Sequence, residues 1–226
     1  MKRTISLFAA LILSPLSALA GSAETRVAEA IEGCSPVLTA QSRQCLVTHI
    51  YMCENDFVAV LFKENSTYSI VWGDAQGGLQ EVAYFSPPSG FRLTEIIAPS
   101  SIDDLRGTGK SGFHAIGNLT SGKIALGTIE VSWETKLSGR VVDFNGIGFR
   151  TGQSVTTIKL PGDLGDRVTT SKIFLANDYD LVLSGETFSE SNEDPNSPKY
   201  RLMDVTRPGQ PGFLSTTGLY DCRGSN

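Results

Sequence analysis

From Gln44 onward, short apolar segments alternate with clusters of turn-forming residues, and this alternation constrains the fold more than any other feature of the chain. The first segments are Leu46–Met52, Phe57–Lys63, Thr67–Trp72, Leu79–Phe85 and Phe91–Ile97. The connections between them are short and rich in Gly, Pro, Asn and Asp, the residues that form tight turns. Short connections favour antiparallel pairing of consecutive strands, so we predict a meander.

The same pattern continues toward the C-terminus. Asn145-Gly146 is the strongest hairpin signal in the chain, because both residues tolerate the positive φ angles of a two-residue turn. Two short helices are predicted, Ala23–Glu32 and Ser100–Leu105, the second with Ser101 as its N-cap. The further strands are predicted at Gly112–Asn118, Lys123–Trp133, Arg140–Phe144, Ile147–Arg150, Ser154–Leu160, Val168–Ala176, Leu181–Phe188 and Lys199–Val205.

These segments amount to about eleven or twelve strands, spaced as in sandwiches and barrels. A flat open sheet of that width would expose long unpaired edges, whereas a sheet that curls protects them. We therefore predict a mainly β fold: an antiparallel meander that forms a curved sheet, half-barrel or barrel with one or two short helices. A β-sandwich is the alternative.

Residues 1–20 predict export. Lys2 and Arg3 precede an apolar stretch, and Ala18-Leu19-Ala20 has the small-x-small pattern of a signal-peptidase site. Cleavage near Ala20 would leave residues 21–226 as a single β-rich domain in the periplasm or outside the cell. The apolar stretch is too short to span a bilayer, and no later run approaches the about 20 residues that a membrane helix needs. We expect no stable membrane span.

The charge balance argues against nucleic acid as a partner. The chain carries 19 Lys and Arg against 24 Asp and Glu, a formal net charge of −5. Because Lys2 and Arg3 leave with the signal, the mature domain is more acidic still. An acidic surface repels phosphate backbones.

The four cysteines are Cys34, Cys45, Cys53 and Cys222, and an even number in an exported chain favours two disulfides. Cys45 and Cys53 flank one predicted strand and would lie about 26 Å apart, whereas a disulfide needs Cα atoms within about 7 Å. We favour Cys34–Cys45, which closes a loop over residues 35–44, together with Cys53–Cys222. The pairing Cys34–Cys53 with Cys45–Cys222 stays open.

Two motifs suggest cofactor sites, but the surrounding residues argue against both. Cys45, His49 and Cys53 would share one face of a helix as zinc ligands, but the residues between them favour a strand, in which neighbouring ligands lie about 13 Å apart. The segment 107–111 looks like the end of a phosphate-binding loop, but Asp104 stands where that motif needs glycine. We expect no metal and no other cofactor.

No catalytic motif is recognisable, so the sequence favours a non-catalytic protein. The chain has 2 histidines, His49 and His114. Neither lies near a Gly-x-Ser-x-Gly nucleophile motif. Because catalytic triads are defined by geometry and not by order, an exported hydrolase that uses His49 or His114 is retained as an alternative.

Aromatic residues on the predicted strands point to binding. Trp72, Tyr84, Phe91 and Trp133 would line an apolar cavity if the sheet curls, and would otherwise fill its core. We predict a non-catalytic periplasmic binding or carrier module for an apolar small molecule, a lipid or a lipidated partner. An envelope scaffold that acts through contacts with another protein is a further alternative.

Several short motifs together resemble a family of uncharacterised exported proteins from Gram-negative bacteria. The motifs are Cys45 with Cys53-Glu54-Asn55-Asp56, Leu119-Thr120-Ser121-Gly122-Lys123, Phe144-Asn145-Gly146-Ile147, Pro208-Gly209-Gln210-Pro211-Gly212-Phe213 and Tyr220-Asp221-Cys222. The resemblance implies export, the β-rich class and paired cysteines. It carries over no catalytic or binding residue.

Overall fold

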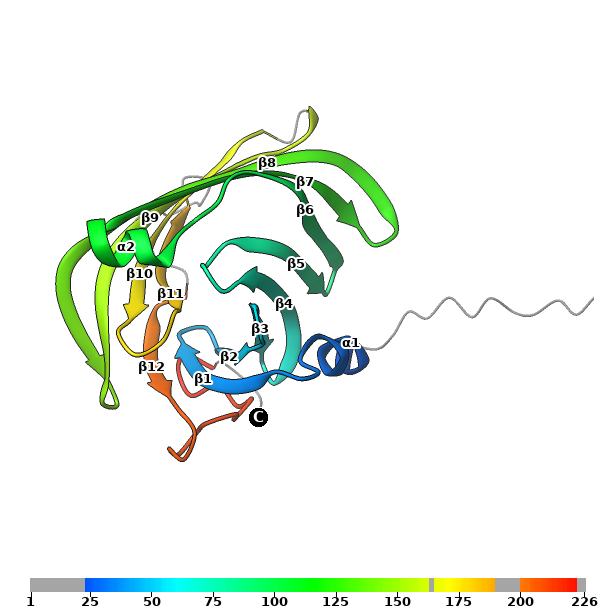
Figure 1. The fold of residues 1–226 in the computed structure, drawn as a ribbon. Helices are drawn as coiled ribbons and strands as arrows, with labels where there is room; N and C mark the ends of the chain where they lie inside the picture. The colour runs from blue at the N-terminus through cyan, green and yellow to red at the C-terminus, as the bar shows by residue number, and fades with distance from the viewer. Residues whose placement is uncertain (1–22, 163–164, 190–199, 223–226) are drawn as a thin grey trace, which may run out of the picture.

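The computed structural model describes residues 23–162, 165–189 and 200–222, and its strands form one antiparallel sheet (Figure 1). The predicted signal segment lies outside the described residues. The helices are α1 Ala23–Ala30 and α2 Ile102–Thr108. The strands are β1 Ser35–Ser42, β2 Leu46–Met52, β3 Asp56–Lys63, β4 Ser66–Asp74, β5 Leu79–Phe85, β6 Pro88–Ala98, β7 Lys110–Ser121, β8 Ile124–Phe144, β9 Ile147–Lys159, β10 Arg167–Ala176, β11 Val182–Ser189 and β12 Leu202–Thr206.

The sheet curls into a nearly closed barrel. Consecutive strands pair from β1 to β11, and β12 pairs with the other edge of β1. Within the described residues no ladder joins β11 to β12, and an ion pair bridges them instead, with Glu186 Oε1 at 3.1 Å from Arg201 Nε. We call this junction the β11–β12 seam. The predicted class is confirmed, and the sandwich alternative is excluded because all twelve strands belong to one sheet.

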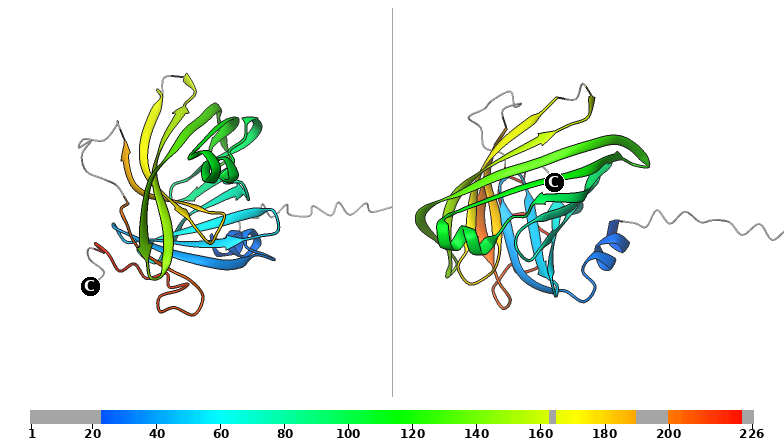
Figure 2. Two further views of the ribbon diagram at one scale, coloured as in Figure 1. Left: turned by 60° about the vertical axis from the view of Figure 1, so that its left-hand side comes forward. Right: turned by 45° about the horizontal axis from the view of Figure 1, so that its top comes forward.

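The strongest turn signal is confirmed, but two pairs of predicted strands are each one continuous strand. The predicted strands Ile147–Arg150 and Ser154–Leu160 form the single strand β9. Asn145 and Gly146 have φ angles of 51° and 77°, as a type I′ hairpin turn requires. The segments predicted before and after residues 134–139 form one strand, β8, whose strong bend Figure 2 shows. A register shift between Leu137 and Val141 accommodates the intervening residues as a bulge.

The prediction of a loop over residues 35–44 was wrong, because Ser35–Ser42 forms β1. The alternation of apolar and polar residues in this strand is weak, because the strand contains Pro36 and several small polar residues. The inward-facing Leu38 and Ala40 are buried at 0% and 6% exposure. Since β1 pairs with both β2 and β12, it joins the two ends of the chain.

The favoured disulfide pairing was also wrong, and the pairing left open is the one observed. β1 pairs with β2 with Ser35 opposite Met52, which brings the adjacent Cys34 and Cys53 to a Cα separation of 4.3 Å. Cys45 bonds to Cys222 at a Cα separation of 4.7 Å. Because residues 35–42 form a strand and not a loop, Cys34 and Cys45 lie near opposite ends of β1.

The C-terminal tail, residues 207–222, covers the outer face of β1 and β2. Thr39 Oγ1 accepts a hydrogen bond from the Leu214 amide at 2.9 Å, and the Gln41 side chain bonds the backbone of Thr217 and Leu219, each at 3.2 Å. These contacts explain why Thr39 and Gln41 are polar and yet buried.

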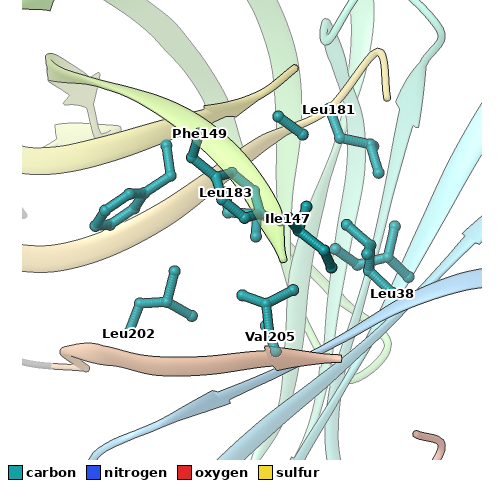
Figure 3. Packing of buried hydrophobic residues seen from close by; sticks show 11 residues of the cluster. Leu38, Ile147, Phe149, Leu181, Leu183, Leu202 and Val205 are labelled. Atoms are coloured by element: carbon teal, nitrogen blue, oxygen red, sulfur yellow. The ribbon is translucent and has the colours of Figure 1, made fainter. Parts of the chain in front are cut away.

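The core cluster lies where the two ends of the sheet meet. Figure 3 shows Leu202 and Val205 of β12 pointing toward Phe149 and Leu183. The rings of Phe144, Phe149 and Phe174 pack edge-on, with centroids 5.5–6.4 Å apart. The buried members of the cluster are Leu38, Ala40, Ile50, Ile147, Phe149, Phe174, Ala176, Leu181, Leu183, Leu202 and Val205.

One end of the barrel is closed by α2. Ser101 caps this helix as predicted, accepting a hydrogen bond from the Asp104 amide at 2.9 Å. Ile102 and Leu105 are buried against Leu175 of β10. The Arg106 guanidinium donates to the carbonyls of the β10–β11 turn. We call this the closed end, and the end with the β1–β2, β3–β4 and β5–β6 turns the mouth end.

Candidate functional site

A cavity of about 620 Å³ lies inside the barrel toward its mouth end. Strands β1 to β5 form one side of it, and β11 forms the other. Two further residues complete the lining: Arg167 at the start of β10, and Tyr200 just before β12. The cavity therefore lies directly behind the β11–β12 seam, where the sheet lacks a hydrogen-bonded ladder.

Polarity changes along the cavity. Toward the closed end the lining is apolar and comes from Ala40, Ile50, Ala59, Val71, Val82 and Leu183. Toward the mouth end, the lining is more polar: the same strands contribute Ser42, Tyr68, Tyr84 and Thr187 as well as Leu46 and Leu61, next to Arg167 and Tyr200. The result is an apolar floor below a polar rim.

Three tyrosines gather at this rim. The rings of Tyr68 and Tyr84 meet edge-on, with centroids 5.6 Å apart. Burial raises the pKa of Tyr84 above its usual value, and the neighbouring Tyr68 and Tyr200 raise it further. The pKa of Tyr200 is raised by burial and then by Tyr68. All three phenols therefore lie close together, and Tyr84 and Tyr200 keep their protons well above neutral pH.

Arg167 is the one charged side chain among the described residues that line the cavity. It is exposed, as its position at the rim requires. The part of the chain that the structure describes contains no ion pair of Arg167, in contrast to Arg201, which pairs with Glu186 across the seam. The rim therefore presents a positive charge to solvent.

The four aromatic residues predicted to line a cavity are not brought together. Tyr84 lines the cavity of about 620 Å³, and it also borders a pocket of about 380 Å³ together with Phe91, whereas Trp72 borders a separate hollow of about 680 Å³. Trp72 packs in a separate cluster with α1, which lies outside the barrel in Figure 1. Trp133 stacks on Phe113 with a centroid separation of 3.8 Å.

Sequence reasoning missed Tyr68, Arg167 and Tyr200. Tyr68 and Tyr84 each stand near the end of a predicted strand that meets the same end of the barrel, and this signal was available. Arg167 and Tyr200 follow long connections, so no periodicity of the sequence placed them near the other two.

His49 has a structural role, which is to hold the C-terminal tail in place. Its Nε2 donates a hydrogen bond to the Ser215 carbonyl at 3.0 Å, and its ring packs against Phe62 at 4.7 Å. Only 3% of the residue is exposed, and this burial lowers the pKa of His49 from its ordinary value of 6.5, against a smaller raising effect of the Ser215 bond. The ring stays neutral and holds the tail on β2.

His114 belongs to a polar cluster on the outer face of the barrel. Its Nε2 lies 2.8 Å from Glu130 Oε1, and Lys159 Nζ lies 3.0 Å from the same oxygen. The hydrogen bond from Lys159, followed by the one from His114, lowers the pKa of Glu130. Ser132 lies opposite His114 on the neighbouring strand. A histidine, a carboxylate and a serine therefore share one face.

Acyl transfer needs hydrogen-bond donors that most of the described backbone around this cluster cannot supply. An oxyanion hole requires backbone N–H groups that are free to point at the substrate. Around His114 the ladders of β7 with β8 and of β8 with β9 are continuous, so the described backbone groups between these strands are used within the sheet. The β6–β7 ladder has a register shift between Ile96 and Ala98, opposite His114. The geometry supplies a solvated ion-pair network.

The described residues contain neither a cluster of candidate metal ligands nor a helix that could span a membrane. Both sulfurs of the proposed zinc motif, Cys45 and Cys53, are bonded in disulfides. Across residues 23–162, 165–189 and 200–222 no three His, Cys, Asp or Glu side chains gather as metal ligands. In the same ranges neither helix has the length and apolarity to cross a bilayer. Two disulfides are typical of an oxidising, extracytoplasmic environment.

Comparison with known proteins leaves the cavity as the basis for any functional argument. No protein-family model, no curated protein and no solved structure matches this chain. The fold and the site define a class nonetheless: a disulfide-bonded, nearly closed β-barrel with an internal amphipathic cavity.

Proposed function

We propose that this protein is a non-catalytic carrier that binds an apolar or amphipathic small molecule, or the lipid chain of a partner, inside its barrel. The observation that carries the proposal is the cavity of about 620 Å³ with its apolar floor. That volume lies within the range of about 300–1,000 Å³ that encloses small-molecule ligands. The proposed location is the periplasm or the cell exterior, after cleavage near Ala20.

The barrel framework keeps the cavity from collapsing. Each strand from β1 to β5 is hydrogen-bonded to a neighbour on both sides, so these strands cannot move inward to fill the cavity. The side chains of Val71 and Val82 therefore face the cavity, and Ile50 lies between the cavity and the core cluster. An apolar ligand there gains about 25 cal/mol for each Å² of apolar surface that leaves water.

The hydrolase alternative has less support. His49 is buried and bonded to the tail, and His114 lies on the opposite face of the sheet from the cavity, paired to Glu130. Neither described histidine therefore lies at the cavity. The scaffold alternative requires no cavity at all, so a binding measurement separates it from the carrier.

The test is a titration of the oxidised mature protein with an apolar fluorescent dye, N-phenyl-1-naphthylamine, combined with native mass spectrometry. Ala59→Phe places a ring in the cavity, and Ala125→Phe makes the same change at an exposed position on β8. We expect Ala59→Phe to weaken dye binding at least about tenfold and Ala125→Phe to leave it unchanged. Thermal unfolding of both variants confirms that they fold.

Leu61→Trp, also at the cavity, serves as a second blocking variant if Ala59→Phe fails to fold. A folded blocking variant that binds dye as tightly as the wild type would place the binding site elsewhere. Wild-type protein that binds no dye and carries no co-purified ligand would favour the scaffold.

A further inference from the structure

We infer that the ligand is a single-chain anionic amphiphile, whose alkyl chain fills the cavity floor while Arg167 and the rim tyrosines hold its carboxylate or phosphate head. This inference rests on the proposed function and names the ligand class of the same site. It requires three features, namely a polarity gradient, a positive rim and hydrogen-bond donors at that rim.

The gradient runs along individual strands, and this fixes the orientation of the ligand. On β4 and β5, the lining residues toward the closed end are Val71 and Val82, and those toward the mouth end include Tyr68 and Tyr84, whereas β3 contributes the apolar Ala59 and Leu61. A uniformly apolar ligand would leave the rim hydroxyls buried without partners, which is costly. An amphiphile with its head at the mouth satisfies both parts of the lining.

The charge at the rim selects an anion. Arg167 is the charged member of the described lining, and no carboxylate of the described residues joins it there. Among the described residues, Glu186 lies on β11 at the seam, and its Oε1 is already 3.1 Å from Arg201 Nε. A guanidinium with free donors binds a carboxylate or a phosphate through paired charge-assisted hydrogen bonds.

The phenols supply further donors. Tyr84 and Tyr200 remain protonated because burial and their neighbours raise their pKa values. Within the described residues, none of the hydroxyls of Tyr68, Tyr84 and Tyr200 has a protein hydrogen-bond partner, so each O–H can donate to a ligand oxygen. An ammonium head group would instead meet the Arg167 cation, and no described residue of the lining offers a compensating carboxylate.

The volume of the cavity favours a ligand with one alkyl chain over a ligand with two. A cavity of about 620 Å³ is of the size that encloses a drug-sized molecule. A single-chain amphiphile is of that size, whereas a diacyl phospholipid is larger.

The experiment compares probes that share a twelve-carbon chain: laurate, dodecyl phosphate, dodecanol and dodecyltrimethylammonium. Each is titrated by calorimetry below its micelle-forming concentration. The variants are Arg167→Gln and, as a matched control, Arg140→Gln, which removes an exposed cation from β8. A charge-assisted hydrogen bond corresponds to about a tenfold to hundredfold gain in affinity.

We expect wild type and Arg140→Gln to bind laurate or dodecyl phosphate at least about tenfold more tightly than dodecanol. Arg167→Gln removes that preference and leaves dodecanol binding unchanged, and Tyr84→Phe with Tyr200→Phe reduces it in part. Relative affinities of the two anions tell a carboxylate head from a phosphate head.

Equal binding of dodecanol and both anions by the wild type would overturn the anionic head while leaving the carrier proposal intact. Preference for the ammonium probe would overturn it likewise. Failure of all four probes to bind would overturn the carrier proposal and this inference together. Retention of the anion preference in Arg167→Gln would show that another group holds the head.

Discussion

The two ends of the barrel interior are built from the same strands, but one is filled and the other is hollow. At the closed end, the rings of Phe149 and Phe174 pack against leucine and valine side chains from the opposite edge of the sheet. At the mouth end, the lining combines small side chains, such as Ser42 and Ser69, with the rim tyrosines, and it leaves a cavity of about 620 Å³. Hydrogen-bonded strands set the diameter, so side-chain size decides where a barrel is hollow.

The disulfides give the largest expected effect, since one lies at each end. Cys45–Cys222 encloses a sequence separation of 177 residues at the mouth end, and Cys34–Cys53 encloses 19 at the closed end. On the chain-entropy argument, Cys45→Ser with Cys222→Ser lowers the free energy of unfolding by roughly 5 kcal/mol, and Cys34→Ser with Cys53→Ser by roughly 3. Urea unfolding measures both.

The mouth-end pair also fastens the tail, so its removal is expected to expose the tail to proteolysis while the closed end stays protected. Equal losses of unfolding free energy in the two double variants would mean that the two disulfides contribute equally to stability.

Core truncation tests the contrast in packing directly. Phe149 is fully buried, and Phe149→Ala is expected to lower the free energy of unfolding by about 3–5 kcal/mol. Leu61 borders the cavity, so Leu61→Ala removes fewer contacts and is expected to cost below about 1.5 kcal/mol. Urea unfolding again measures the difference. Similar costs at the two positions would show that the mouth end is packed as tightly as the closed end.

The tail contact predicts a pH effect. His49→Ala removes a buried hydrogen bond and a ring contact, and it is expected to lower the free energy of unfolding by about 2 kcal/mol. Because burial lowers the pKa of His49, the unfolded chain takes up a proton below pH 6.5 and the folded protein does so only at lower pH. Wild-type stability therefore falls as the pH drops below 6.5.

His49→Gln is expected to lose this pH dependence in thermal unfolding. Glu130 does not interfere, since its pKa lies below an ordinary value of 4.5 and its stabilisation is lost only as the pH falls below that value. An unchanged pH profile in His49→Gln would contradict the assignment to His49.

The seam gives the smallest stability effect. Glu186→Gln removes the partially exposed ion pair with Arg201 and is expected to cost below about 1 kcal/mol. Because the seam borders the cavity, the same change is expected to speed dye release in stopped-flow measurements. Lys159→Gln, which removes an ion pair on the outer face, is the matched control. Equal release rates in both variants would mean that the ligand leaves by another route.

The candidate site was only partly predictable. Tyr84 was identified from its strand, because alternation assigns side chains to one face of a sheet. The location of Trp72 outside the barrel could not be predicted, since a strand pattern does not indicate which face of the sheet α1 will cover. Arg167 and Tyr200 reach the cavity through the closure of the barrel, which no local pattern records.

By itself the sequence determined most of the strands from Leu46 onward, their antiparallel order and the hairpin at Asn145-Gly146, because alternation and turn chemistry act over a few residues. Tertiary structure decided the rest. The strand β1 has a weak local signal and forms because β2 and β12 pair with it on both sides, and that pairing selected Cys34–Cys53 and Cys45–Cys222. The filled and hollow ends likewise depend on contacts between residues far apart in the chain, and such contacts exist only once the sheet has curled.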